Sequence, residues 1–210
     1  MITIFSENSP AMRFLSKLAD LMVLNLLFVA TSLPLITLGA SLTALNATAI
    51  SLVTGRYDSI PRTYLGAFRS NFRRGTLLGL VALGLIAVVA AWYVVIDRAD
   101  VDALLRLLLF AAVLLLAYRV IGTLIFLFPY QATFSDSFGR VINNARRMSA
   151  RHPVAAFTVL VVTVLPIVVG VYYPQVFVWG IVWLAFGFSG IAFVNAIVLV
   201  NVFKKYGLEA

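Results

Sequence analysis

Long apolar runs recur along almost the whole of this 210-residue chain, and they limit its possible folds more than any other feature. A helix needs about 20 apolar residues to cross a hydrocarbon core about 30 Å thick, and most of the runs reach that length. The runs leave no stretch over for a separate soluble domain. The sequence therefore predicts an all-α fold, a polytopic helical membrane bundle that forms a single membrane domain over residues 1-210.

The composition excludes several classes of protein. Hydrophobic residues make up 62% of the chain and charged residues 11%, whereas soluble domains have roughly 45–50% and about 25%. Cysteine is absent and His152 is the single histidine, so we expect no disulfide, no metal site and no cofactor. The formal net charge is +8, but the basic residues lie between the apolar runs, which indicates membrane topology and no nucleic-acid partner.

Six membrane segments are predicted, at about 14-36, 40-54, 75-96, 103-128, 154-173 and 176-203. The segment 40-54 is short for a full crossing, because Pro34 and Gly39 interrupt the apolar run before it. It either crosses, which gives six segments, or it is re-entrant, which leaves five full spans.

The positions of the basic residues favour six crossings. With six, the cations at 13–17, 56–74, 140–151 and 204–205 fall on one side, and the other side has Arg98 together with three aspartates. Cytoplasmic loops carry the excess of Lys and Arg, so both termini are predicted to be cytoplasmic in a multi-pass protein of the bacterial plasma (inner) membrane. With five crossings, Arg13 and Lys17 would lie outside, against this bias.

The two long cytoplasmic loops, 61-74 and 134-151, are predicted to form amphipathic interfacial helices, because apolar residues recur at helical spacing in each. One interpretation is a pair of surface helices that bind the lipid bilayer through its anionic lipids. The other is a docking surface for a cytoplasmic partner, and the sequence does not discriminate between them. The basic residues of these loops are Arg62, Arg69, Arg73, Arg74, Arg140, Arg146, Arg147 and Arg151.

A few polar side chains interrupt the apolar segments, where each charge costs roughly 2.5 to 3.5 kcal/mol on insertion scales. At a rise of about 1.5 Å per residue, Arg119 lies about 13 Å and Asp20 about 9 Å from the cytoplasmic face, so the two are predicted to pair. We expect one intramembrane polar layer, which is either a structural clamp or the lining of a cavity open to the cytoplasm. Its predicted members are Asp20, Asn25, Asn46, Arg119 and Asn195.

The sequence also contains a pair of small residues that favours helix packing, and it lacks known catalytic motifs. Gly75 and Gly79 form a small-xxx-small pair, which predicts close helix packing within the chain or, alternatively, a dimer face. His152 lies where the fifth segment begins, with no nucleophile or acid near it in the sequence. Phosphate-binding glycine loops and hydrolase or metalloprotease motifs are absent, so the chain is not expected to be an enzyme and no catalytic residue is assigned.

Several different short motifs are distributed between the first segment and the second long loop. They are Leu24–Phe28, Ser32–Ala40, Thr43–Leu45, Ala67–Arg74, and Asn144–Arg146 with His152–Pro153. These stretches resemble the YesL-like family of bacterial integral membrane proteins, and the likeness covers most of the chain. The resemblance implies an integral membrane protein of poorly defined activity, in a family associated with carbohydrate-utilisation genes. It supplies no catalytic residues, and it draws attention to Asn25 and to the helix break from Pro34 to Gly39.

We therefore expect a component or accessory of solute transport, with carbohydrate or oligosaccharide as the solute. Its expected partners are a sugar-transporter permease or further copies of the chain. The alternative is a membrane scaffold or regulatory protein whose basic loops bind anionic lipid or a cytoplasmic partner. A water-filled cavity joining the predicted polar residues would favour transport, whereas a dry and satisfied cluster would favour the scaffold.

Overall fold

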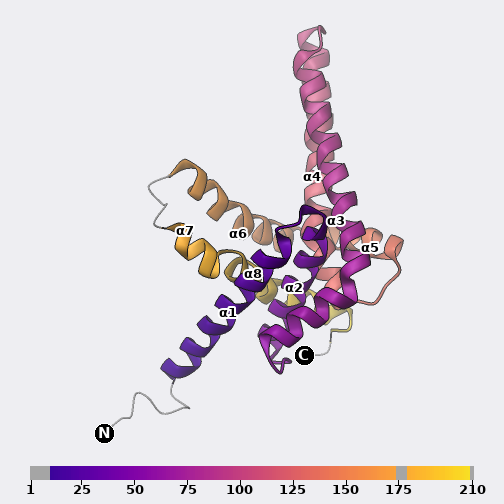
Figure 1. The fold of residues 1–210 in the computed structure, drawn as a ribbon. Helices are drawn as coiled ribbons and strands as arrows, with labels where there is room; N and C mark the ends of the chain where they lie inside the picture. The colour runs from indigo at the N-terminus through magenta and orange to yellow at the C-terminus, as the bar shows by residue number, and fades with distance from the viewer. Residues whose placement is uncertain (1–9, 174–178, 209–210) are drawn as a thin grey trace.

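The computed structural model describes residues 10–173 and 179–208, which form helices joined by short turns, with no strand among them. This confirms the predicted all-α class. Figure 1 shows the helices in chain order. Their bounds are α1 Pro10–Ser32, α2 Leu38–Thr54, α3 Ile60–Arg98, α4 Ala103–Thr133, α5 Phe138–Arg151, α6 Pro153–Tyr172, α7 Trp179–Val182 and α8 Phe188–Phe203.

Within the described part of the chain, six helical stretches are long and apolar enough to cross a membrane, as predicted. The ambiguous second segment is one of them, with 20 residues and a mean hydropathy of 1.6. At about 1.5 Å per residue it measures about 30 Å, which is enough for a crossing. The six stretches are Ala11–Ser32, Leu35–Thr54, Ile60–Arg98, Ala103–Thr133, Pro153–Tyr172 and Trp183–Tyr206.

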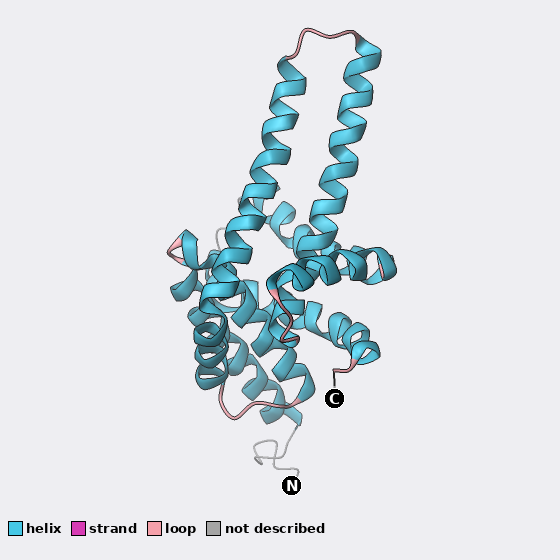
Figure 2. Ribbon diagram, turned by 90° about the vertical axis from the view of Figure 1, so that its right-hand side faces the viewer, coloured by secondary structure: helices cyan, strands magenta, loops and turns pink. Residues whose placement is uncertain are grey.

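The helices α3 and α4 form a long hairpin that extends beyond the other helices, and Figure 2 shows its two arms side by side. Near the turn, the rings of Tyr93 and Phe110 join the arms with their centroids 5.5 Å apart. The Asp102 carboxylate caps α4 by accepting a hydrogen bond from the Leu105 N–H at 3.0 Å. Most large apolar side chains along the hairpin are exposed, which suits a surface surrounded by lipid.

The most enclosed of these six stretches contains α2, which packs against α1, α3, α4 and α8. Its alanines, serines and threonines are small enough to let neighbouring helices approach closely. The hydroxyls are satisfied within the helix: Thr43 Oγ1 donates to the Gly39 carbonyl oxygen at 2.8 Å, and Thr48 Oγ1 donates to the Ala44 carbonyl oxygen at 2.9 Å. The segment that the sequence leaves most ambiguous is therefore the centre of the bundle.

Glycines bring the backbones of α2 and α3 into contact. A Cβ atom added to Gly39 would overlap the Gly75 carbonyl oxygen and lie 2.7 Å from the Gly79 Cα atom. A Cβ atom added to Gly75 would lie 2.7 Å from the Ala40 Cα atom. Real Cβ atoms essentially never come so close to other heavy atoms. The predicted small-residue pair thus packs within the chain, with α2 as its neighbour.

Pro34 lies in the turn between α1 and α2. The next three residues, Leu35–Thr37, form a single 3₁₀ turn. Thr37 Oγ1 donates to the carbonyl oxygens of Thr31 at 2.6 Å and Pro34 at 2.7 Å. These bonds satisfy carbonyl groups that the helix break leaves without a helical partner. The interruption seen in the sequence is accordingly a closed turn.

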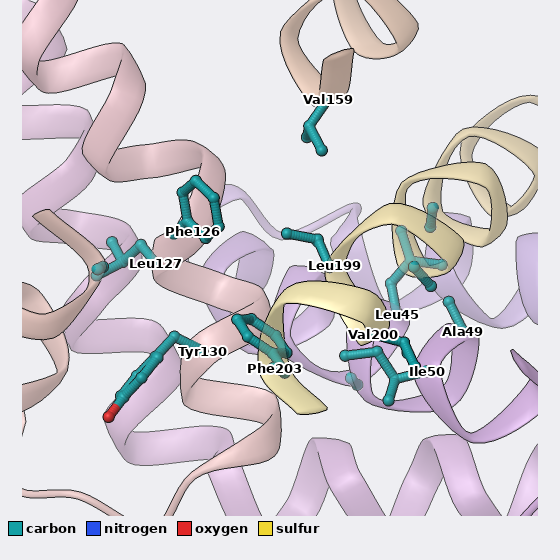
Figure 3. Packing of buried hydrophobic residues seen from close by; sticks show 14 of the residues in the cluster. Leu45, Ala49, Ile50, Phe126, Leu127, Tyr130, Val159, Leu199, Val200 and Phe203 are labelled. Atoms are coloured by element: carbon teal, nitrogen blue, oxygen red, sulfur yellow. The ribbon is translucent and has the colours of Figure 1, made fainter. Parts of the chain in front are cut away.

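A hydrophobic core forms where α2, α4 and α8 meet (Figure 3). The Phe203 ring centroid lies 6.4 Å from that of Tyr130 and 5.5 Å from that of Phe134, both nearly edge-on. These contacts place the end of α8 against the end of α4. The labelled core residues are Leu45, Ala49 and Ile50 of α2, Phe126, Leu127 and Tyr130 of α4, Val159 of α6, and Leu199, Val200 and Phe203 of α8.

Two helices continue past the bounds predicted for their membrane segments. The loop 61-74 is predicted as a helix separate from the span 75-96, but α3 runs unbroken from Ile60 to Arg98. Nothing in the backbone ends it, since residues 62–98 contain no proline. The helix α4 likewise continues through Pro129 to Thr133. Its last turns are buried against neighbours, which offsets the hydrogen bond that proline cannot donate.

The second amphipathic loop agrees better with its prediction. The helix α5 lies within 134-151 and buries Val141, Ala145 and Met148 on one face.

The last membrane segment is less regular than expected, because a π-helical turn at Trp183–Gly187 separates α7 from α8. The beginning of the predicted segment 176-203 lies outside the described residues.

Candidate functional site

Asn25 joins the first membrane segment to the widened turn of the last one. Its side chain is fully buried. The Nδ2 group donates to the carbonyl oxygens of Trp183 at 3.0 Å and Leu184 at 2.7 Å. The Oδ1 atom accepts a hydrogen bond from the Ser189 N–H at 2.9 Å. One amide therefore bonds backbone groups at both ends of the π-helical turn.

The geometry of the turn explains why it needs such a partner. In a π-helix each N–H bonds to the carbonyl five residues earlier, so backbone groups at its ends lose their usual α-helical partners. A side chain that inserts there can satisfy them. Trp183 packs its ring against Gly187, where an added Cβ atom would lie 2.9 Å from the ring carbon Cδ2. These contacts make Asn25 a structural clamp between α1 and the last segment.

The other two predicted amides are held elsewhere. Asn195 is buried in α8 and donates from Nδ2 to Thr163 Oγ1 of α6 at 3.0 Å. Its Oδ1 atom is buried with no hydrogen-bond partner among the described residues. Asn46 donates to the Leu42 carbonyl oxygen of its own helix at 2.8 Å. None of these hydrogen bonds reaches Asn25, so they do not link the three amides into one layer.

The predicted ion pair between Asp20 and Arg119 is not formed. The Asp20 carboxylate instead accepts a hydrogen bond at 2.9 Å from the hydroxyl of Tyr57, a residue of the turn between α2 and α3. The Arg119 side chain is exposed on α4 and makes no ion pair or hydrogen bond with any described residue. Counting residues from the ends of the spans places both residues at a similar depth, but it does not say toward which neighbour each helix turns a side chain.

The environment of Arg119 also differs from the expected one. The Ser149 side chain of α5 lies against Gly122 of α4, three residues after Arg119. At a rise of about 1.5 Å per residue, that is less than one helical turn away. The polar helix α5 therefore approaches α4 within one turn of Arg119.

The contact between Tyr57 and Asp20 affects the titration of the phenol. Partial burial raises the pKa of Tyr57 above its usual value of 10.0, and the hydrogen bond to the Asp20 carboxylate and the negative charge of that carboxylate raise it further. The neutral phenol is the form that can donate to the carboxylate. This pair therefore ties α1 to the turn between α2 and α3 as long as Tyr57 keeps its proton.

The hollow beside the π-helical turn is an apolar groove of about 330 Å³. None of the five predicted polar residues lines it, so it is not the polar cavity that a solute pathway requires. Its lining residues are Pro166, Val169 and Gly170 of α6 and Val182, Trp183, Phe186, Gly187 and Ile191 of the last segment.

All eight arginines of the two predicted basic loops are exposed. Two of them have acidic neighbours: Arg62 lies 3.7 Å from Asp58, and Arg140 lies 3.7 Å from Asp136. Arg74 of α3 donates to the Asp136 carbonyl oxygen at 3.4 Å, which links α3 to the turn before α5. The basic side chains of α3 and α5 thus meet at one end of the bundle.

A polar pocket of about 390 Å³ opens among these basic residues. It lies between the end of α4, the helix α5 and the turn that follows α8. We call it the basic pocket. The residues that line it are Tyr130, Phe134, Asp136, Asn144, Arg147, Met148, Arg151 and Tyr206.

A hydrogen-bonded network forms one wall of the basic pocket. Asp136 Oδ2 accepts from the Tyr130 hydroxyl at 2.6 Å and from Asn144 Nδ2 at 3.1 Å. Asn144 Nδ2 also lies 2.8 Å from the Tyr130 hydroxyl oxygen and donates to it. Asp136 Oδ1 faces Arg140 at 3.7 Å, which is too long for a hydrogen bond. One carboxylate oxygen therefore keeps the capacity to accept from a ligand.

Two arginines make another part of the lining positively charged. Arg147 and Arg151 follow each other by one turn of α5, and neither side chain has an ion pair or hydrogen bond with any described residue. Tyr206 also lines the pocket, and its hydroxyl oxygen lies 3.0 Å from His152 Nε2. Free guanidinium groups form strong charge-assisted hydrogen bonds with phosphate and carboxylate oxygens. This part of the lining is therefore suited to an anion.

Sequence reasoning identifies only part of the basic pocket. It singles out Arg147 and Arg151, and the helical spacing of Asn144, Arg147, Met148 and Arg151 places these four on one face of α5. No local pattern indicates that Tyr206 approaches His152, 54 positions earlier in the chain. Among the described residues, no group of three or more His, Asp or Glu side chains could hold a metal ion.

Comparison with known proteins gives a match to a family over part of the chain and no activity. No curated protein and no solved structure matches the chain. The matched range, residues 21–93, includes Asn25, the Pro34 turn and the contact of Gly39 with Gly75 and Gly79. The residues that line the basic pocket come after this range. Residues 21–93 of this chain match a family described as a protein of unknown function, DUF624.

Proposed function

We propose that this chain is an accessory membrane protein that conducts no solute itself and acts through the basic end of its bundle. There it binds anionic phospholipid headgroups of the cytoplasmic leaflet. The observation that carries the proposal is the placement of the polar groups. The amides of Asn25, Asn46 and Asn195 donate hydrogen bonds to nearby helices or to their own helix, whereas two exposed arginines line an open pocket at one end.

The case against an autonomous solute pathway rests on the predicted polar residues. A transport site needs polar groups that converge on a cavity. Asn25 is occupied by backbone groups of the π-helical turn, Asn46 bonds its own helix, and Asn195 bonds α6. The groove beside Asn25's partners is apolar. This arrangement supports a structural role for the intramembrane amides.

The case for anionic lipid rests on the basic end. Eight exposed arginines occur on α3 and α5, and each basic residue near an anionic leaflet is worth on the order of 1 kcal/mol. The excess of Lys and Arg at this end supports a cytoplasmic orientation in a bacterial plasma membrane. The resemblance to the YesL-like family supports an accessory role in carbohydrate uptake, with a permease as partner. Catalysis is not part of the proposal.

The lipid part of the proposal is tested by quantifying the lipids that copurify with the full chain from native membranes. A variant in which Arg140, Arg146, Arg147 and Arg151 are all changed to Gln serves for comparison. We expect the wild type to be enriched in anionic phospholipid relative to the bulk membrane and the variant to lose that enrichment. Equal lipid profiles for the two proteins would contradict this part.

The transport part is tested with the same purified chain in liposomes. We expect proteoliposomes that contain the chain alone to remain impermeable to mono- and oligosaccharides in an osmotic swelling assay. Crosslinking in native membranes should recover a permease together with the chain. Saccharide entry through the chain alone, absent in protein-free liposomes, would contradict the accessory role.

A further inference from the structure

We propose that the basic pocket binds a phosphate ester of a polyol, with the phosphate on Arg147 and Arg151 and a polyol hydroxyl on Asp136. This inference rests on the proposed function, since it names the ligand of the same basic end. The chemistry has two possible sources: the headgroup of phosphatidylglycerol in the bilayer, or a soluble glycerol phosphate.

The phosphate position follows from the two free guanidinium groups. Arg147 and Arg151 line the pocket from the same face of α5. Neither has a partner among the described residues, so binding an anion there breaks no ion pair within that part of the chain. One guanidinium group can donate two parallel hydrogen bonds to two oxygens of a phosphate, and it remains charged at physiological pH.

The hydroxyl position follows from the acidic wall. Tyr130 and Asn144 hold Asp136 Oδ2, which fixes the carboxylate and leaves Oδ1 without a hydrogen-bonded partner. The Oδ1 atom, which faces Arg140 at 3.7 Å, can accept a hydrogen bond from a hydroxyl and would repel a second anionic group. The ligand should therefore combine a negatively charged group with hydroxyl donors. A glycerol headgroup meets both requirements.

Net charge separates this ligand from a zwitterionic one. An ethanolamine headgroup could also place a donor on Asp136, but it has no net charge. Arg140 lies 3.7 Å from Asp136 Oδ1, and Arg147 and Arg151 add two further charges, so the pocket carries more positive than negative charge. Such a pocket favours a ligand with a net negative charge.

Size and position also fit a headgroup. The pocket volume of about 390 Å³ lies at the small end of the range of roughly 300–1,000 Å³ found for ligand sites. Phe134, Met148 and Tyr206 give it an apolar rim that can cover the glycerol carbons. The pocket opens at the end of α4, which is one of the apolar membrane-spanning helices. A lipid could accordingly insert its headgroup while its acyl chains remain in the bilayer.

The test measures how ligands raise the melting temperature of the full chain in detergent, because a ligand that binds the folded state stabilises it by mass action. The probes are dioctanoyl phosphatidylglycerol, its phosphatidylethanolamine and phosphatidic acid counterparts, and glycerol 3-phosphate. We expect a saturable increase with phosphatidylglycerol and a much smaller one with the other two lipids. An increase with glycerol 3-phosphate at similar concentrations would identify the soluble ester as the source and keep the assigned chemistry.

Variants locate the binding to the pocket. We expect Arg147→Gln and Arg151→Gln each to weaken phosphatidylglycerol binding about tenfold, the effect of losing one charge-assisted contact. Arg146→Gln is the matched control, because Arg146 lies on the same helix, is exposed and bonds Asn143 instead of lining the pocket. Asp136→Ala should remove the preference for phosphatidylglycerol over phosphatidic acid.

Two results would overturn the inference. Equal losses from Arg146→Gln and Arg147→Gln would mean that lipid binds the surface charge in general, which leaves the proposed function intact and removes the pocket. Equal stabilisation by phosphatidylglycerol and phosphatidic acid in the wild type would remove the hydroxyl position on Asp136. If no anionic ligand stabilises the wild type and its copurifying lipids are not enriched, both the inference and the proposed lipid binding fail.

Discussion

The Nδ2 atom of Asn25 lies 2.7 Å from the Leu184 carbonyl oxygen, so one buried amide joins the first membrane segment to the last. The same side chain accepts from the Ser189 N–H, on the far side of the π-helical turn. A turn of this kind exposes backbone groups that cost free energy when buried without partners. The clamp therefore accounts for an irregular helix without requiring a ligand at that position.

Replacing Asn25 with Leu should destabilise the fold. The change preserves size but leaves the carbonyl groups of Trp183 and Leu184 and the Ser189 N–H without this partner. We expect a loss of about 1–3 kcal/mol, measured as a lower melting temperature in detergent. Asn46→Leu is the matched control, because that amide bonds only its own helix and should cost much less. Equal melting temperatures for the two variants would contradict the clamp.

Arg119 should be dispensable for stability. Its side chain is exposed and makes no contact with Asp20 in the structure, so Arg119→Leu should change the free energy of unfolding by less than about 0.5 kcal/mol. In combination with Asp20→Asn, the two effects should add without coupling. A strongly destabilising Arg119→Leu change that Asp20→Asn rescues would show that the two side chains pair after all.

Gly39 should not tolerate even one added methyl group. In Gly39→Ala the new Cβ atom overlaps the Gly75 backbone, so α2 and α3 must separate. We expect a loss of about 1–3 kcal/mol in detergent melting, typical of overpacking. Gly66→Ala adds the same group to open space on α3 and should be neutral or slightly stabilising. The backbone contact is refuted if both alanine variants melt like the wild type.

Tyr57 should make stability fall at high pH. Its phenol has a raised pKa in the folded chain, so its contribution is complete below the unfolded value of about 10 and is lost as the pH rises through the folded pKa. Deprotonation would place a second negative charge beside Asp20 and remove the donated proton. Melting temperatures at alkaline pH should therefore fall more steeply for the wild type than for Tyr57→Phe. Parallel curves for the two proteins would argue against the contact.

The helical content and the number of spanning segments follow from the sequence, because run length and hydropathy are local properties. The long apolar runs near residues 75-96 and 154-173 correspond to parts of α3 and to α6. The apolar face of α5 follows from its spacing: Val141, Ala145 and Met148 are buried, whereas Phe138 at the start of the same face is exposed. The glycines at 75 and 79 indicate close packing, although only the structure names Gly39 as their partner.

The arrangement of the polar residues does not follow from the sequence. Depth along a span can be counted, but the direction of each side chain depends on how all the helices pack. Asp20 therefore bonds Tyr57 of a turn, and Asn25 bonds a π-helical turn that hydropathy does not reveal. The basic pocket depends in the same way on Tyr206 reaching α5 from the end of the chain.

The proposed lipid binding requires that the basic end of the bundle faces the cytoplasm, and cysteine accessibility can measure this orientation because the chain has no cysteine of its own. Two single-cysteine variants suffice: Asp100→Cys at the tip of the hairpin of α3 and α4, and Ala150→Cys on the exposed face of α5. If the basic end is cytoplasmic, a membrane-impermeant maleimide will label the hairpin tip in cells with an intact plasma membrane. It will label α5 only after that membrane is permeabilised. Labelling of α5 in the intact cells, with the hairpin tip protected, would contradict this orientation.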